Sequence, residues 1–178
     1  MSYIFFVFHF FFFNHINSSC FHNKHLALKG NQYIDIRPLI KVNTDHIRFF
    51  EISTSKKGGP RLVGLHHDYN LNFKKKGLVA YHDVVKGRRG AFGANVSIKN
   101  TNYGFKTLFS PYWSYNEIVK ILIALCVKRY NKMTVNQYFK KITQEAFDGT
   151  VGGLLVRIVF DRMKFLVVSA YPLIEKPC

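Results

Sequence analysis

A regularly alternating segment in the middle of the chain, residues 91–99, constrains the fold most. Its apolar and polar side chains fall on opposite faces of an extended chain: Phe92, Ala94, Val96 and Ile98 on one, Asn95, Ser97 and Lys99 on the other. Side chains alternate along a β-strand, so the pattern predicts a strand with one face in the core and the other in water. Strands of this kind belong to antiparallel sheets.

The segments on either side extend this strand into a sheet. Residues 78–86 are rich in β-branched and aromatic side chains, and the turn Gly87–Gly90 joins them to residues 91–99. We therefore expect a hairpin whose turn exposes two arginines. A third strand is expected around residues 105–109.

Two helices are expected next. Ser114 and Glu117 have the spacing of a capping box, and apolar residues then recur at the helical positions 118, 121, 122 and 125. A second helix is expected to begin at Thr134 and to end near Asp148–Gly149, with an apolar side made of Val135, Tyr138, Phe139, Ile142 and Ala146.

Residues 154–160 and 165–171 are predicted as two closing strands, joined by a turn at Asp161–Arg162. We therefore expect one domain over residues 31–178. Its class is α+β, with helices packed on mostly antiparallel β-sheets.

The chain is strongly basic. Its 178 residues carry 26 Lys and Arg against 10 Asp and Glu, a formal net charge of +16. Such a charge favours polyanionic partners such as RNA, DNA or an anionic membrane surface, although a soluble protein can also simply be basic. The three cysteines, Cys20, Cys126 and Cys178, lack the spacing of a metal site, and Cys126 is expected in the core.

Residues 1–30 differ from the rest of the chain. Seven of the 18 Phe lie between Phe5 and Phe13, a run as long as the apolar part of a signal peptide and too short to span a bilayer. No Lys or Arg precedes the run, which argues against a signal peptide. We expect residues 1–30 to be a signal-like or non-native extension outside the fold, and any membrane contact to occur only through them.

Histidine and lysine are the side chains left for chemistry. The sequence has no phosphate-binding glycine loop, nucleophile elbow or cysteine zinc pattern, and its acids are few for a two-metal nuclease site. RNA brings its own nucleophile, the ribose 2′-hydroxyl, so an enzyme needs a base, an acid and a cation for the phosphorane charge. Histidines and a lysine suit these tasks. Beyond residue 30 the histidines are His46, His66, His67 and His82, and each alone could equally be structural.

The last predicted strand carries two hydroxyl groups. Ser169 and Tyr171 are two residues apart, so both project to the same face of a strand, and Pro172 marks its end or an edge. The strand is either a simple core strand with Tyr171 partly buried, or a strand that presents both hydroxyls to a substrate.

Several segments, in this order, resemble the EndoU family of uridylate-preferring endoribonucleases, and most of all its bacterial toxin-type branch. The resemblance covers roughly residues 43–173 and implies an RNase A-like catalytic domain. It rests on His46-Ile47 with Glu51, Gly64-Leu65-His66-His67, Gly90 to Val96, Lys106 to Ser114, Gly149 to Leu154, and Ser169-Ala170-Tyr171-Pro172.

The resemblance implies three catalytic residues, His46, His66 and Lys106. One histidine would be the general base on the 2′-hydroxyl and the other the general acid, with His66 as the base in one assignment and the reverse order open. Lys106 would be the cation. No metal ion and no cofactor are implied.

The resemblance also implies a substrate-binding set. Ser169 would contact the pyrimidine or the phosphate, and Tyr171 would stack on or orient the ribose and base. Thr150 and His67 are expected to contribute as well. His66 and His67 are adjacent, so only one can point into the cleft, and we expect His66 to do so. The loop from Lys56 to Arg61 could add phosphate contacts or displace His46.

These expectations describe an endoribonuclease that leaves 2′,3′-cyclic phosphate ends. A toxin-type member would act on tRNA or other cellular RNA, would be secreted or delivered into a target cell cytoplasm, and would be bound by a cognate immunity protein. Two alternatives stay open: a non-catalytic RNA-binding module of the same fold, and a membrane-surface protein anchored by residues 1–30.

Overall fold

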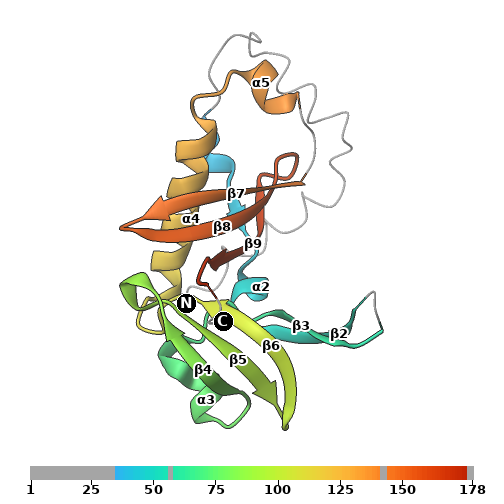
Figure 1. The fold of residues 1–178 in the computed structure, drawn as a ribbon. Coiled ribbons are helices and arrows are strands. Elements are labelled where there is room, and N and C mark those ends of the chain that lie inside the picture. Colours follow the sequence, from blue (N-terminus) through green and yellow to red (C-terminus); the bar gives the residue numbers. More distant parts are fainter. Residues whose placement is uncertain (1–34, 56–57, 141–143, 176–178) are drawn as a thin grey trace, which may run out of the picture.

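The structure is a computed structural model that describes residues 35–55, 58–140 and 144–175. These residues form an α+β protein with mostly antiparallel sheets and few helices, as the sequence predicts (Figure 1). The predicted extension over residues 1–30 lies outside the described residues, as do Cys20 and Cys178.

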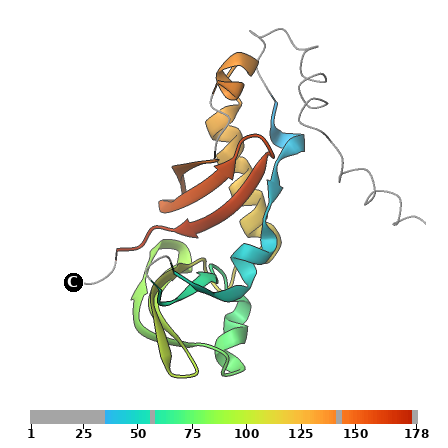
Figure 2. The same ribbon diagram turned by 90° about the vertical axis from the view of Figure 1, so that its right-hand side faces the viewer.

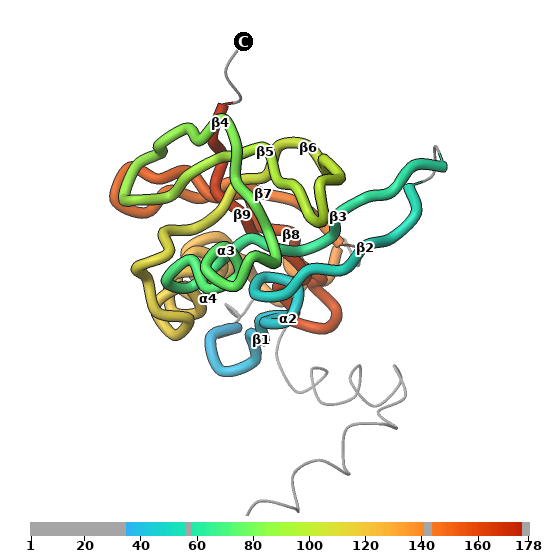
Figure 3. The backbone as a smooth tube through the Cα atoms, turned by 90° about the horizontal axis from the view of Figure 1, so that it is seen from below, coloured from blue at the N-terminus to red at the C-terminus, as the bar shows by residue number. Residues whose placement is uncertain are grey.

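One half of the molecule is built on the alternating segment. Strands β4 (Ala80–Lys86), β5 (Phe92–Ile98) and β6 (Thr101–Leu108) form an antiparallel sheet in the order β4-β5-β6. The four apolar side chains of β5 are buried, as predicted, and pack with Leu62, Leu65, Val79 and Leu108. A separate hairpin, β2 (Phe50–Thr54) and β3 (Pro60–Gly64), extends away from the body (Figures 1 and 3).

The other half is a four-stranded sheet that packs on a long helix. Its order is β1-β9-β8-β7, comprising β1 (Lys41–Val42), β9 (Leu166–Pro172), β8 (Leu154–Asp161) and β7 (Gln144–Val151). Only the β1–β9 pairing is parallel among the described strands. Helix α4 (Tyr115–Tyr130) covers one face, and Figure 2 shows this sheet and the β4–β6 sheet as separate layers.

Helix α4 begins as the sequence predicts. The Ser114 side chain accepts a hydrogen bond from the Glu117 backbone, and the Glu117 carboxylate accepts one from the Ser114 backbone, which completes the capping box. Cys126 is fully buried on the apolar side of the helix, as expected.

The prediction for the second helix is wrong beyond its first turns. Helix α5 begins after its cap Thr134 but spans only Val135–Phe139, and β7 follows where the helix was expected to continue. Along β7 exposure alternates with a period of two, and all eight residues pair with β8. Pairing with a long partner strand outweighs the local helical spacing of Phe139 and Ala146. Ile142, expected on the same helical face, lies outside the described residues.

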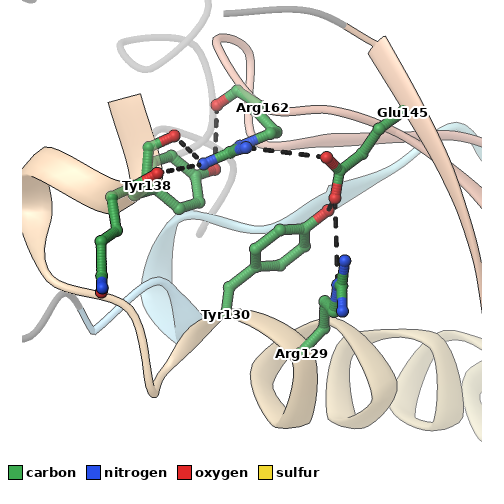
Figure 4. Close-up of polar contacts among 6 residues, drawn as sticks. Arg129, Tyr130, Tyr138, Glu145 and Arg162 are labelled. Carbon is green, nitrogen blue, oxygen red and sulfur yellow. Dashed lines mark hydrogen bonds and ion pairs between the residues drawn. The ribbon is translucent and has the colours of Figure 1, made fainter. Parts of the chain in front are cut away.

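A buried arginine holds the short helix on the sheet (Figure 4). Arg162, 4% exposed, donates to the backbone carbonyls of Gln137 and Tyr138, which are left open where α5 ends. Its guanidinium lies 3.6 Å from the Glu145 carboxylate, which also accepts a hydrogen bond from the Tyr130 hydroxyl at 2.5 Å. The network explains how α5 can end after five residues and still be anchored.

The other helical segments are single turns. They are η1 (Arg37–Leu39), α2 (Thr44–Arg48), η2 (Tyr69–Leu71), α3 (Asn72–Lys75) and η3 (Arg88–Gly90). Helix α2 contacts both β3 and β9, so it lies where the two halves of the molecule meet.

Candidate active site

A cavity of about 610 Å³ lies at this junction. Strands β3, β6 and β9 and helix α2 contribute to its walls. Its lining includes five of the residues predicted from the sequence, together with one further cation: His46, His66, Lys106, Ser169 and Tyr171, with Arg61.

Helix α2 positions His46. The Asn43 side chain caps the helix by accepting a hydrogen bond from the His46 backbone N–H at 3.3 Å. The backbone N–H of Asn43 donates in turn to the Val167 carbonyl of β9 at 2.8 Å. The turn that carries His46 is therefore tied directly to the strand that carries the two hydroxyl groups.

A glycine lets the chain carry His66 past this helix. Gly64 has a φ of +76°, and a Cβ added there would lie 2.7 Å from the His46 carbonyl oxygen and closer still to that of Phe49. Only glycine fits this left-handed conformation at such a close approach. The His66 backbone N–H then donates to the Ile47 carbonyl at 2.9 Å, which fixes the two histidine-bearing segments side by side.

Three rings follow one another across the cavity. The ring centroids of His46 and His66 are 5.6 Å apart, and the rings are tilted by 43°. The His66 and Tyr171 centroids are 5.2 Å apart, and these rings are stacked with an interplanar angle of 25°. The Nδ1 atom of His66 lies 3.5 Å from the Thr107 carbonyl oxygen, too far for a strong hydrogen bond. Two imidazoles and a phenol thus face one space.

Burial and nearby cations hold both imidazoles neutral at neutral pH. Burial lowers the pKa of His66 to about 3, helped by the charges of Lys106 and His46. Burial also lowers the pKa of His46, and the charges of Lys106 and Arg61 lower it further. Each ring therefore keeps a free lone pair, and each pKa depends on the same cation, Lys106.

Lys106 and Arg61 bring two positive charges to the cavity. The Lys106 ammonium donates to the Leu62 carbonyl at 2.6 Å, and burial together with Arg61 lowers the pKa of Lys106. Arg61 was predicted only as part of a basic loop, and its place in the cavity was missed. The chain runs from Arg61 to His66 through Gly64. The positive φ of Gly64 interrupts the regular alternation of side chains, so the sequence does not show that Arg61 and His66 face the same cavity. Of the expected loop over residues 56–61, Pro60 and Arg61 belong to strand β3, and Arg61 pairs with Ser53 of β2.

Strand β9 ends at Pro172 and carries Ser169 and Tyr171 into the cavity, as predicted. Tyr171 pairs with Arg157 of the neighbouring strand. Arg157 in turn makes two hydrogen bonds to the Asp148 carboxylate, at 2.8 and 2.9 Å. These bonds, the Asp148 charge and the adjacent Tyr171 raise the pKa of Arg157. A fixed cation therefore stands beside Tyr171.

The structure does not bring His67 and Thr150 to this cavity. His67 is 2% exposed and lines a second cavity of about 450 Å³ on the other side of the chain, because adjacent side chains of an extended segment point in opposite directions. Thr150 is exposed near the β7–β8 turn and pairs with Leu155, two strands away from β9. We therefore leave both residues out of the site.

Comparison of the chain with known proteins does not identify a family: no protein-family model matches the chain, and no curated protein matches it. The likeness to EndoU enzymes therefore stays a prediction that rests on the segments quoted above. Over residues 35–55, 58–140 and 144–175, no group of three or more His, Cys, Asp or Glu side chains is arranged to hold a metal ion. Within those same ranges, no helix is long and apolar enough to cross a membrane.

Proposed function

We propose that the protein is an endoribonuclease of the EndoU type, with an RNase A-like catalytic domain, which leaves 2′,3′-cyclic phosphate ends without a metal ion. One observation carries the proposal: two neutral imidazoles, a lysine and a hydroxyl-bearing strand line a single cavity in a protein of charge +16. That set supplies a base, an acid and a cation, the three groups that cleavage by the 2′-hydroxyl requires.

We assign His66 as the general base. It is the more deeply buried imidazole and the one kept most firmly neutral, so its lone pair is free to take the 2′-hydroxyl proton. The 2′-oxygen then bonds to phosphorus, and the bond from phosphorus to the 5′-oxygen breaks. His46, which is less buried, gives its proton to that leaving oxygen. The reverse assignment requires the buried His66 ring to be protonated before the reaction begins, which burial disfavours.

Substrate binding allows His46 to take up from solvent the proton that it later donates. Lys106 and Arg61 lower the pKa of His46 in the free protein, and a bound phosphate compensates their charge. The pKa of His46 then rises, so that the imidazolium forms beside the substrate. Lys106 stabilises the phosphorane charge, a contribution typically worth about 3 kcal/mol.

The closing strand provides the contacts to the nucleoside. Ser169 binds the base or phosphate, and Tyr171 orients the ribose and base, with Arg157 beside it. As a toxin-type member, the protein would act on tRNA or other cellular RNA after secretion or delivery into a target cell cytoplasm. An immunity protein would bind over the basic cavity.

The test is a cleavage assay with purified protein and a chelator. We expect RNA to be cut, DNA to be left intact, and His46→Ala and His66→Ala each to abolish cutting. The matched control is His82→Ala, because His82 lies on β4, is exposed and does not line the cavity. Cleavage that needs an added metal, or that survives both substitutions, contradicts the mechanism.

A non-catalytic RNA-binding module is the second candidate, and one observation favours it. The pKa of His66 near 3 makes a weak proton acceptor in the free protein, and the Lys106 ammonium is already bound to the Leu62 carbonyl. This candidate predicts salt-sensitive RNA binding without turnover. Unchanged RNA after prolonged incubation with saturating protein would favour it.

A further inference from the structure

We propose that the Gly87–Gly90 turn is a second RNA subsite, in which Arg88 and Arg89 bind phosphates of nucleotides that flank the cleaved one. The inference rests on the proposed function, because it extends the same substrate beyond the cavity. The subsite is separate from the predicted catalytic set, since neither arginine lines the cavity.

Both arginines are exposed and available to an anion. Four ion pairs join described residues, and none of them involves Arg88 or Arg89. The guanidinium of Arg89 lies 5.6 Å from the Trp113 ring centre, a contact that orients the side chain and leaves its charge free for a ligand. Unpaired arginines suit the bidentate recognition of phosphate oxygens.

A pair of glycines makes room for the Arg88 and Arg89 side chains. The β7–β8 turn contains Gly152 and Gly153, and Figure 1 shows this turn next to the β4–β5 turn that holds the arginines. A Cβ at Gly153 would lie 2.7 Å from the Nη1 atom of Arg88, and one at Gly152 would collide with the guanidinium of Arg89. The two arginine side chains therefore pass close to a backbone turn that carries no side chains at these two positions.

The arginine turn adjoins the cavity. A Cβ at Gly87 would lie 2.7 Å from the Cδ1 atom of Ile174, and Ile174 lines the cavity. The preceding residue, Leu173, also lines it, and its N–H donates to the Leu155 carbonyl of β8 at 2.9 Å. An RNA strand that leaves the cavity along the end of β9 thus arrives at the arginine turn.

The neighbouring aromatic side chains identify the ligand class. Tyr112 is 79% exposed and precedes Trp113, the residue on which Arg89 lies. Exposed aromatic rings beside cations are the features that bind single-stranded nucleic acid, because bases stack on the rings while the cations hold the phosphates. We therefore assign the subsite to single-stranded RNA and not to an acidic protein surface.

The experiment compares a short substrate with a long one. Each contains one ribonucleotide in an otherwise 2′-deoxy strand, so the cut site is fixed; one is a dinucleotide and the other has about ten nucleotides, enough to reach a second site. The measured quantity is the ratio of kcat/KM for the long strand to that for the dinucleotide. We expect Arg88→Gln with Arg89→Gln to lower this ratio about tenfold, which corresponds to about 1.4 kcal/mol of phosphate binding.

The matched control removes the same charge elsewhere. Arg37→Gln with Lys132→Gln changes two exposed cations near the far end of α4 and is expected to leave the ratio unchanged. An equal drop in both double variants would mean a general electrostatic effect and would overturn the subsite. Tyr112→Ala, which truncates an exposed ring, provides a second test if the arginine variant fails to fold, and it should lower the ratio as well.

A binding measurement separates this inference from the proposed function. An uncleavable 2′-O-methyl strand of the same length is titrated at several salt concentrations. The arginine variant should bind more weakly than the control, with a salt slope reduced by about 0.7 for each phosphate that the two arginines neutralise. If the natural sequence cuts neither substrate, the nuclease proposal fails while this measurement still decides the subsite. Identical slopes in the two variants would refute it.

Discussion

Acidification should destabilise this protein through His66 in particular. In the folded state burial, Lys106 and His46 lower the pKa of this histidine from 6.5 to about 3, whereas the unfolded chain leaves it at its usual value. The unfolded state therefore binds the proton more readily. The stability contributed by the neutral ring is fully present above pH 6.5 and is lost as the pH falls from there towards the folded pKa.

The size of the effect follows from the shift. Each pKa unit corresponds to about 1.4 kcal/mol, so the full difference between folded and unfolded states amounts to about 5 kcal/mol. Because acidification to about pH 4 covers roughly 2.5 units of that window, the free energy of unfolding should fall by about 3 kcal/mol through His66 alone. The ring is 8% exposed, so solvent screens little of this.

The assay is urea unfolding of the natural sequence and of His66→Phe between about pH 7 and pH 4. Phenylalanine keeps a ring against Tyr171 and cannot take up a proton. Carboxylates and His46 titrate in both proteins, so the difference between the two free energies of unfolding isolates His66. It should shift by about 3 kcal/mol in favour of the variant at low pH. A difference independent of pH would refute the burial argument.

Three further predictions concern the same junction. Lys106→Met should raise the pKa values of His46 and His66, measured by NMR titration, and should slow RNA cleavage by about 100-fold or more. Inorganic phosphate should raise the pKa of His46, and an unchanged titration would show that no anion binds beside it. Gly64→Ala should lower the free energy of unfolding by about 3 kcal/mol or more, since it adds a backbone collision to the strain of a positive φ. Its control, Gly77→Ala, has a similar φ but open space around it, so it should cost only about 1 kcal/mol.

Local patterns predicted the elements whose partners are nearby in the sequence. The alternation of residues 91–99, the capping box of Ser114 and the apolar runs of β8 and β9 each correspond to an observed element. The prediction of a long second helix was wrong because its later residues fit a helical spacing and also a strand alternation. Pairing of β7 with β8 decides between the two structures, and this pairing cannot be recognised from the helical spacing alone.

The site was predictable only in part, for a similar reason. Motif order suggested His46, His66, Lys106, Ser169 and Tyr171, but their meeting in one cavity depends on contacts between distant segments. One is the parallel pairing of β1 with β9, and another is the close approach of Gly64 to the carbonyl of His46. Neither leaves a periodic signal. The positive φ of Gly64 also obscured which side chains of the β3 segment share a face, which is why Arg61 was missed.

The chemical identity of the cleavage ends tests the central claim most directly. A strand with a single ribonucleotide in an otherwise 2′-deoxy sequence is incubated with the protein and a chelator, and the products are weighed by mass spectrometry. The account predicts one cut, on the 3′ side of the ribonucleotide, with a 2′,3′-cyclic phosphate on one product and a 5′-hydroxyl on the other. Cuts next to 2′-deoxy residues, or products that end in a 3′-hydroxyl and a 5′-phosphate, would contradict it.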